Sequence, residues 1–134
     1  GRWIINSKND LRYQLSYGEG LGRYLGLGNG SDVEIDIDGN IQTVTTVAGW
    51  VAWRHDYNAK LRSTLMYSRV NYDHSLANTG GLASKSQQSI RANVFYSPLP
   101  KVDVGAELMY GRREAENGDS GDISRLQFTT KYSF

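Results

Sequence analysis

Basic side chains recur at alternate positions along several stretches of this chain, a spacing that could build an anion-binding surface. They are Arg12, Arg54, Arg62, Arg91, Arg113, Arg125 and Lys131. Alternate residues of an extended strand project to the same face of a sheet, so these side chains would line one surface. A guanidinium group keeps its charge at physiological pH and can donate two parallel hydrogen bonds to a carboxylate. The pattern predicts binding of small anions without a chemical reaction on them.

The stretch from Asp122 to Phe134, DISRLQFTTKYSF, shows how a strand could position such side chains. Its alternate residues separate an apolar face from a polar, cationic one. The first holds Leu126, Phe128, Tyr132 and Phe134, and the second holds Arg125, Gln127 and Lys131. Aromatic rings settle at the boundary between lipid and water, where membrane-spanning barrel strands end. The stretch is therefore typical of a strand in the wall of a transmembrane barrel.

Composition argues against several other classes of protein. The chain contains no cysteine, which excludes a disulfide framework and a thiolate metal site. Its formal net charge of +1 argues against nucleic acid as a partner. Hydrophobic residues make up 39% of the chain, and no apolar run approaches the roughly 18 residues of a spanning helix. Half of each barrel strand faces water, so this composition is expected if strands cross the membrane.

The order of strands and connections supports the same fold. We expect strands near residues 3–7, 11–17, 41–55, 60–73, 88–97, 102–113 and 122–134. Short turns alternate with long polar connections at residues 18–40, 74–86 and 114–121, as in outer-membrane barrels with short periplasmic turns. Aromatic residues then form two girdles. Trp53, Tyr57, Tyr96, Tyr132 and Phe134 would lie at the periplasmic rim, with Tyr67 and Tyr110 toward the outer rim.

The predicted fold is all-β, a single domain over residues 1–134 that contributes about seven strands to a transmembrane antiparallel β-barrel. Single-chain bacterial barrels have even strand numbers, and an open edge in lipid would leave backbone groups unpaired. We therefore expect other strands to complete the barrel. They would come from a preceding part of a longer polypeptide or from other copies.

Three segments carry a resemblance to a known family. DLRYQLSYGEGLGRYLG, VAWRHDYNAKLRSTLMYSRV and the ending LQFTTKYSF resemble the carboxy-terminal portion of the DcaP-like porins, and the likeness covers nearly all of the chain. The resemblance implies a sixteen-stranded homotrimeric pore in the bacterial outer membrane, in contact with lipid and used for uptake of dicarboxylates and similar small anions. It also implies an amino-terminal periplasmic coiled coil. The sequence predicts no cofactor and no enzymatic activity.

The inward basic residues differ in how readily they could meet a solute. Arg12, Arg54, Arg62 and Lys131 are expected near the periplasmic mouth, where basic side chains also aid solubility and snorkelling. Arg113, near the outer entrance, and Arg125, somewhat deeper, are the better candidates because few acids are expected opposite them. Asn93 and Gln127 could add neutral hydrogen bonds at mid-height.

Two acids, Asp103 and Glu107, are expected on the same inward face. Counting back through the reversal between Pro98 and Pro100 places Arg91 opposite Glu107. That pair could be a salt bridge within the wall, or Arg91 could contact solute.

An acidic cluster offers a weak alternative site. Asp32, Glu34, Asp36 and Asp38, followed by a glycine, suggest the oxygen-rich loops that hold calcium. The ligand register of an EF-hand and its distal glutamate are missing, and alternation with Val33, Ile35 and Ile37 favours a short hairpin arm instead. We therefore predict no metal site.

Three rival functions remain open at this point. A barrel enzyme would need a nucleophile beside a base, yet His55 falls near a turn and His74 in a loop. A soluble β-sandwich binding module would show the same alternation with its apolar side sealed in a core. A small structural or adhesive barrel would have a plugged lumen. Detergent dependence and ionic conductance separate these cases from a pore.

Overall fold

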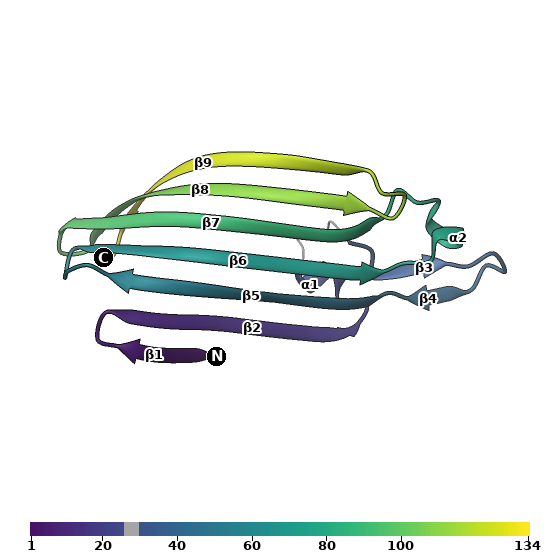
Figure 1. The fold of residues 1–134 in the computed structure, drawn as a ribbon, viewed down its shortest axis with the longest axis horizontal. Helices are drawn as coiled ribbons and strands as arrows, with labels where there is room; N and C mark the ends of the chain where they lie inside the picture. The colour runs from purple at the N-terminus through teal and green to yellow at the C-terminus, as the bar shows by residue number, and fades with distance from the viewer. Residues whose placement is uncertain (26–29) are drawn as a thin grey trace.

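The computed structural model describes residues 1–25 and 30–134, most of which form one antiparallel sheet (Figure 1). Its order across the sheet is β1 (Arg2–Asn6), β2 (Asn9–Glu19), β5 (Thr45–Asp56), β6 (Leu61–Asp73), β7 (Ser84–Leu99), β8 (Val102–Ala115) and β9 (Ser120–Tyr132). Each strand pairs with the next in this order. The prediction of seven antiparallel strands in chain order is confirmed.

The two ends of the sheet differ in their connections. At one end, which we call the short-turn end, tight turns join β1 to β2, β5 to β6 and β7 to β8. At the other, the long-loop end, the connections contain α1 (Gly22–Leu25), a hairpin of β3 (Val33–Ile35) and β4 (Ile41–Thr43), and α2 (Leu76–Thr79). The predicted hairpin arm is confirmed. The predicted strand over residues 41–55 is wrong in one respect, because it is divided between β4 and β5.

Side chains of the sheet divide between two faces. The polar face carries the predicted basic residues, and the apolar face carries leucine, valine and aromatic side chains. On the apolar face, Leu126, Phe128 and Ile90 remain 61%, 75% and 47% exposed. A β-sandwich would seal these side chains between two sheets, so the sandwich alternative is wrong. An exposed apolar face of this extent is expected where lipid covers it.

Strands β1 and β9 form the two edges of the sheet. Within residues 1–25 and 30–134 the sheet does not close on itself. Closure into a barrel with further strands stays a prediction. No helix in this part of the chain is both long enough and apolar enough to cross a membrane.

The reversal between β7 and β8 differs from its predicted form. We expected the chain to reverse between Pro98 and Pro100, yet β7 continues through Pro98 to Leu99. The ladder slips between Tyr96 and Leu99, and a bulge of this kind tolerates a residue without a backbone donor. The turn that follows places Lys101 at a φ of 69°. The slip changes the β8 partner of each residue of β7 from Tyr96 back toward its start.

Candidate pore-lining surface

The register places every predicted lining residue on the polar face. These are Arg12, Arg54, Arg62, Arg91, Asn93, Glu107, Arg113, Arg125, Gln127 and Lys131. One row across the sheet runs from Arg12 through Ala52, Met66, Arg91 and Met109 to Arg125. The next row toward the short-turn end contains Arg54, Asn93, Glu107 and Gln127. The facing of these side chains follows from the period-two pattern of the strands.

At the short-turn end the arginines are paired with acids on the same face. The ion pairs are Arg12–Asp10 at 2.8 Å, Arg54–Asp56 at 2.8 Å and Arg62–Asp103 at 3.0 Å. Lys131 lies directly opposite Asp103 in the ladder. Sequence reasoning missed Asp10 and Asp56 because it assigned both to turns. Their position two residues from an arginine was the available signal, since residues at i and i+2 share a face.

The Arg62–Asp103 pair spans the width of β7. The Arg62 guanidinium lies 5.1 Å from the centroid of the Phe95 ring, as in a cation–π contact. Opposite Phe95 is Gly105, where an added Cβ would lie 2.6 Å from the ring. Ser97 donates to Asp103 as well. A glycine at this position thus lets an aromatic ring lie over β8 and support the ion pair.

The middle of the polar face corrects two predictions. The chain reverses at Pro100 and Lys101 rather than around Leu99, and the ladder slips by one residue between Tyr96 and Leu99. Arg91 therefore lies opposite Met109, and Asn93 takes the place opposite Glu107. The predicted Arg91–Glu107 pair is therefore wrong. Glu107 instead lies 3.6 Å from Arg125 and accepts a 3.5 Å hydrogen bond from Asn93. Arg125, for which we expected few acids opposite, has one carboxylate within reach, that of Glu107.

Arg91 differs from its neighbours on the polar face. Among residues 1–25 and 30–134 it forms no ion pair, and its Nε is buried without a hydrogen-bond partner. Its partners in the ladder are Met66 and Met109, which offer thioethers rather than oxygen acceptors. A guanidinium in such surroundings is poorly compensated and gains much from an anion.

Arg113 lies at the long-loop end, as predicted, but it is held by the protein. Its Nε donates to Ser84 Oγ at 2.7 Å, and its Nη2 donates to the Leu82 carbonyl at 3.1 Å. These bonds tie the start of β7 to β8. Arg113 therefore places a charge at the long-loop end and anchors the loop that precedes β7.

The connection between β2 and β5 folds onto the polar face. Leu25 of α1 packs against a buried cluster formed by Val44, Ala48, Val70 and Tyr72. Ala48, Val70 and Tyr72 belong to the polar face, so α1 covers its outer part. Sequence reasoning left the facing of residues beyond Ser68 uncertain. The alternation continues there, and the apolar pair Val70 and Tyr72 is buried by α1.

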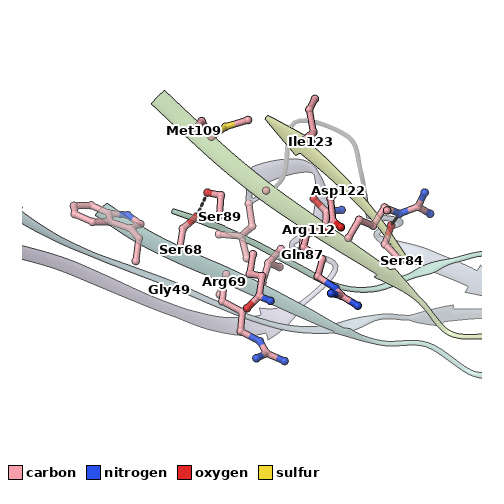
Figure 2. A pocket seen from close by; sticks show the side chains of 18 of the residues that line it. Gly49, Ser68, Arg69, Ser84, Gln87, Ser89, Met109, Arg112, Asp122 and Ile123 are labelled. Carbon is pink, nitrogen blue, oxygen red and sulfur yellow. Dashed lines mark hydrogen bonds between the residues drawn. The ribbon is translucent and has the colours of Figure 1, made fainter. Parts of the chain in front are cut away.

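Beside α1 lies a hollow of about 1170 Å³ over the polar face. Its lining includes Tyr24, Trp50, Arg91 and Arg113. Figure 2 shows Ser68 and Ser89, whose hydroxyls share a 2.8 Å hydrogen bond, on this surface. The hollow extends from the unpaired Arg91 to Arg113 at the long-loop end.

A carboxylate links the hairpin to the loop that contains α2. Glu34 accepts hydrogen bonds from the Ser75 backbone nitrogen at 3.1 Å and from Asn78 Nδ2 at 2.8 Å. His74 Nδ1 lies 3.4 Å away. Burial alone would raise the pKa of Glu34, but these three contacts together outweigh it and lower the pKa. The contact therefore favours an ionised Glu34.

The acidic residues considered for calcium are used in separate interactions. Asp32 pairs with Arg23 at 3.6 Å, and Glu34 binds the α2 loop. Asp36 accepts hydrogen bonds from the backbone nitrogens of Asp38 and Asn40, and the bond from Asn40 is the main cause of its lowered pKa. In the described chain, no three metal-ligating side chains come together. The structure does not assemble these residues into a calcium site.

The two histidines are engaged in structural contacts. His55 Nδ1 lies 2.8 Å from Asn9 Oδ1, and its ring meets Tyr57 edge to face at 4.5 Å. His74 is buried beside Glu34 and Tyr72. In residues 1–25 and 30–134, neither ring is hydrogen-bonded to a serine hydroxyl. The arrangement lacks the nucleophile and base of a hydrolytic site.

Comparison with known proteins shows a family match and a similar fold. Residues 48–134 match the family described as DcaP outer membrane protein. The crystal structure of the outer membrane channel DcaP of Acinetobacter baumannii is similar, with a TM-score of 0.82 and 24% sequence identity over 99% of this chain. The chain spans 38% of that channel's length. No curated protein matches the sequence.

Proposed function

The chain belongs to the DcaP outer membrane protein family and resides in the bacterial outer membrane, and from that premise we propose that its sheet forms part of the wall of a porin for small anions. The apolar face contacts lipid, and the polar face lines a water-filled passage. Further strands close the barrel, which has sixteen in all and assembles as a homotrimer. The protein acts by selection and passive diffusion and is not an enzyme.

The observation that carries this proposal is the unpaired Arg91 on the polar face. The other guanidinium groups there have acidic or backbone partners, whereas Arg91 has none among the described residues. Low-dielectric walls around a narrow channel strengthen the field of such a charge and concentrate anions near it. Arg91 is therefore the residue that makes the passage prefer anions over cations.

Small dicarboxylates are the solute class that this surface supports best. Arg91 and Arg125 occupy the same row with Met109 between them, so their backbones are roughly 10 Å apart at two strand spacings. Two flexible guanidinium groups at that separation can each reach one carboxylate of a short solute. The 3.6 Å Arg125–Glu107 contact is longer than a strong charge-assisted hydrogen bond, which leaves Arg125 able to exchange partners.

The overall charge of the polar face points the same way. Its basic residues outnumber its acidic residues, which in the ladder positions of the seven strands are Asp10, Asp56, Asp103 and Glu107. Three of these acids lie at the short-turn end. The passage is therefore most positive in its middle and toward the outer opening.

The test is the reversal potential of the full-length protein in planar bilayers under a potassium chloride gradient. We expect anion preference, and Arg91→Gln should reduce it about fivefold, since a unit charge at contact distance in water is worth about 1 kcal/mol. Arg69→Gln is the matched control because it removes the same charge from the apolar face. Cation preference of the wild type, or an equal change in both variants, would overturn the proposal. An absence of conductance would favour a structural barrel.

A further inference from the structure

The apolar face of the sheet ends in a polar row at the long-loop end. Across β6, β7, β8 and β9, ladder partners form the row Arg69, Gln88, Arg112 and Asp122. The row immediately toward the short-turn end is Tyr67, Ile90, Tyr110 and Ser124. Lipid-facing tyrosines lie at the level of the headgroups. The two arginines therefore begin where the hydrocarbon of the outer leaflet ends.

Both arginines point away from the polar face. Arg69 and Arg112 share the parity of the apolar residues Tyr67 and Tyr110 on their own strands, and both are exposed. Figure 2 shows the Arg69 side chain leaving the sheet on the side away from Met109. The period-two pattern therefore places both charges on the apolar face rather than on the polar one.

Neither guanidinium is neutralised within the described chain. Arg69 Nε donates to Asn71 Oδ1 at 3.0 Å, and Arg112 Nη2 donates to Ser120 Oγ at 3.1 Å, and both acceptors are uncharged. Asp122 lies opposite Arg112 but is hydrogen-bonded to the Tyr110 hydroxyl and forms no ion pair in residues 1–25 and 30–134. Most of the donors on the two guanidinium groups are therefore free.

We propose that Arg69 and Arg112 form a binding site for the phosphate group of an anionic lipid in the outer leaflet. The two strands that carry them are separated by β7, at roughly 10 Å between backbones. Arginine side chains are long enough to converge from that separation on one phosphate, and the planar guanidinium donates in pairs to phosphate oxygens. Gln88 lies between them in the ladder, and its Oε1 accepts a 3.0 Å hydrogen bond from the Tyr67 hydroxyl.

Two observations favour a lipid headgroup as the ligand of this site. The row continues directly from the exposed apolar face, on which Tyr67 and Tyr110 are 42% and 46% exposed. Its charge is complementary to a headgroup phosphate at the height where headgroups lie. The inference depends on the outer-membrane location and on the long loops facing outward. It does not depend on anion selectivity, so either proposal can fail without the other.

The test uses the full-length protein in phosphatidylcholine nanodiscs with or without diphosphorylated lipid A, and measures retained lipid A by native mass spectrometry. The wild type should retain lipid A, and the Arg69→Gln/Arg112→Gln variant should retain at least about tenfold less, because it lacks the charge-assisted hydrogen bonds to the phosphate. Arg69→Lys/Arg112→Lys should retain an intermediate amount. Heat-modifiable migration verifies that each variant is folded.

The control is Arg91→Gln, which removes a charge from the opposite face of the same sheet and should leave lipid A retention unchanged. Retention equal to wild type in the double glutamine variant would overturn the inference. Equal loss in Arg91→Gln would show a general charge effect and would overturn it too. Loss of subunit association in the double variant, with lipid A still bound, would identify the row as a contact between copies and would also overturn the inference.

Discussion

The two ends of the polar face use the same residue types differently. At the short-turn end, Arg12, Arg54 and Arg62 each have a carboxylate at 2.8 to 3.0 Å. Arg91, which lies in the same ladder row as Arg12 and one row from Arg54, has no partner among the described residues. Both sets satisfy the same alternating pattern. The difference shows that facing alone does not make a guanidinium available to solute, because the acids around it decide whether its charge is already compensated.

The ends also differ in what covers them. At the short-turn end, Asn6 and Asn58 accept backbone hydrogen bonds that close tight turns, and these turns leave the polar face open. At the long-loop end, α1 lies over Val70 and Tyr72 and narrows access to Arg91. A folded segment therefore covers the polar face at the long-loop end, whereas the strands and tight turns alone shape the short-turn end.

The largest effect is expected from displacing the cover at the long-loop end. An added Cβ at Gly22 would lie 2.6 Å from the Gly30 carbonyl oxygen, and backbone cannot move aside cheaply. Gly22→Val should lift α1 from the polar face. In a Val70→Cys background, reaction with a water-soluble maleimide should accelerate about tenfold or more, as expected for the loss of about 1.4 kcal/mol of local protection.

Gly121→Val serves as the control for this change, since nothing lies within 4 Å of an added Cβ at that position. Labelling rates in Gly22→Val that match those of the control would show that α1 does not protect Val70. The polar face at the long-loop end would then be about as accessible to solvent as at the short-turn end.

A second change would leave the short-turn end, like the middle of the polar face, with an arginine that has no carboxylate partner. Asp103→Asn removes the carboxylate that compensates Arg62, so the short-turn end should gain an available guanidinium. Anion preference measured by reversal potential should rise about two- to fivefold. Glu114→Gln, which removes an equal charge at a ladder position of the apolar face, should leave it unchanged. An unchanged preference in Asp103→Asn would mean that pairing does not govern availability.

The smallest expected effect concerns acid at the long-loop end. Because the pKa of Glu34 is lowered in the folded protein, its contribution to stability is fully present above the ordinary glutamate pKa, about 4.3, and is lost as the pH falls through the lowered value. Hydrogen exchange at the Ser75 amide, corrected for intrinsic rate, should show about threefold less protection below that range. Glu34→Gln should abolish this pH dependence, and a dependence that persists would assign it to another group.

Much of this fold could be predicted from sequence because its signals are local. Alternation within each strand and the spacing of the turns gave the seven strands, their direction and the face of each arginine. The same reasoning could not place the turn at Pro100 and Lys101 or the one-residue slip between Tyr96 and Leu99. Together they move the register by two residues and leave the alternation of β7 unchanged. The partner of Arg91 was therefore wrong although its facing was right.

Non-local packing accounts for the rest. Val70 and Tyr72 obscured the alternation of β6, and their burial depends on Leu25, which is far away in the sequence. Asp10 and Asp56 escaped notice because strand ends are the least certain part of a prediction, and each strand extends further than expected. A strand boundary that is wrong by one or two residues thus hides the acid that compensates an arginine, as at Asp10 and Asp56.

The absent side chain at Gly105 has a consequence for electrical recordings. With the Phe95 ring resting over β8 and the Arg62 guanidinium resting over the ring, the charges around that mouth have little freedom to fluctuate. Fluctuations of a single-channel current should then arise from movements of the loops at the long-loop end. A larger residue in place of Gly105 would displace the Phe95 ring and add current fluctuations from the short-turn end.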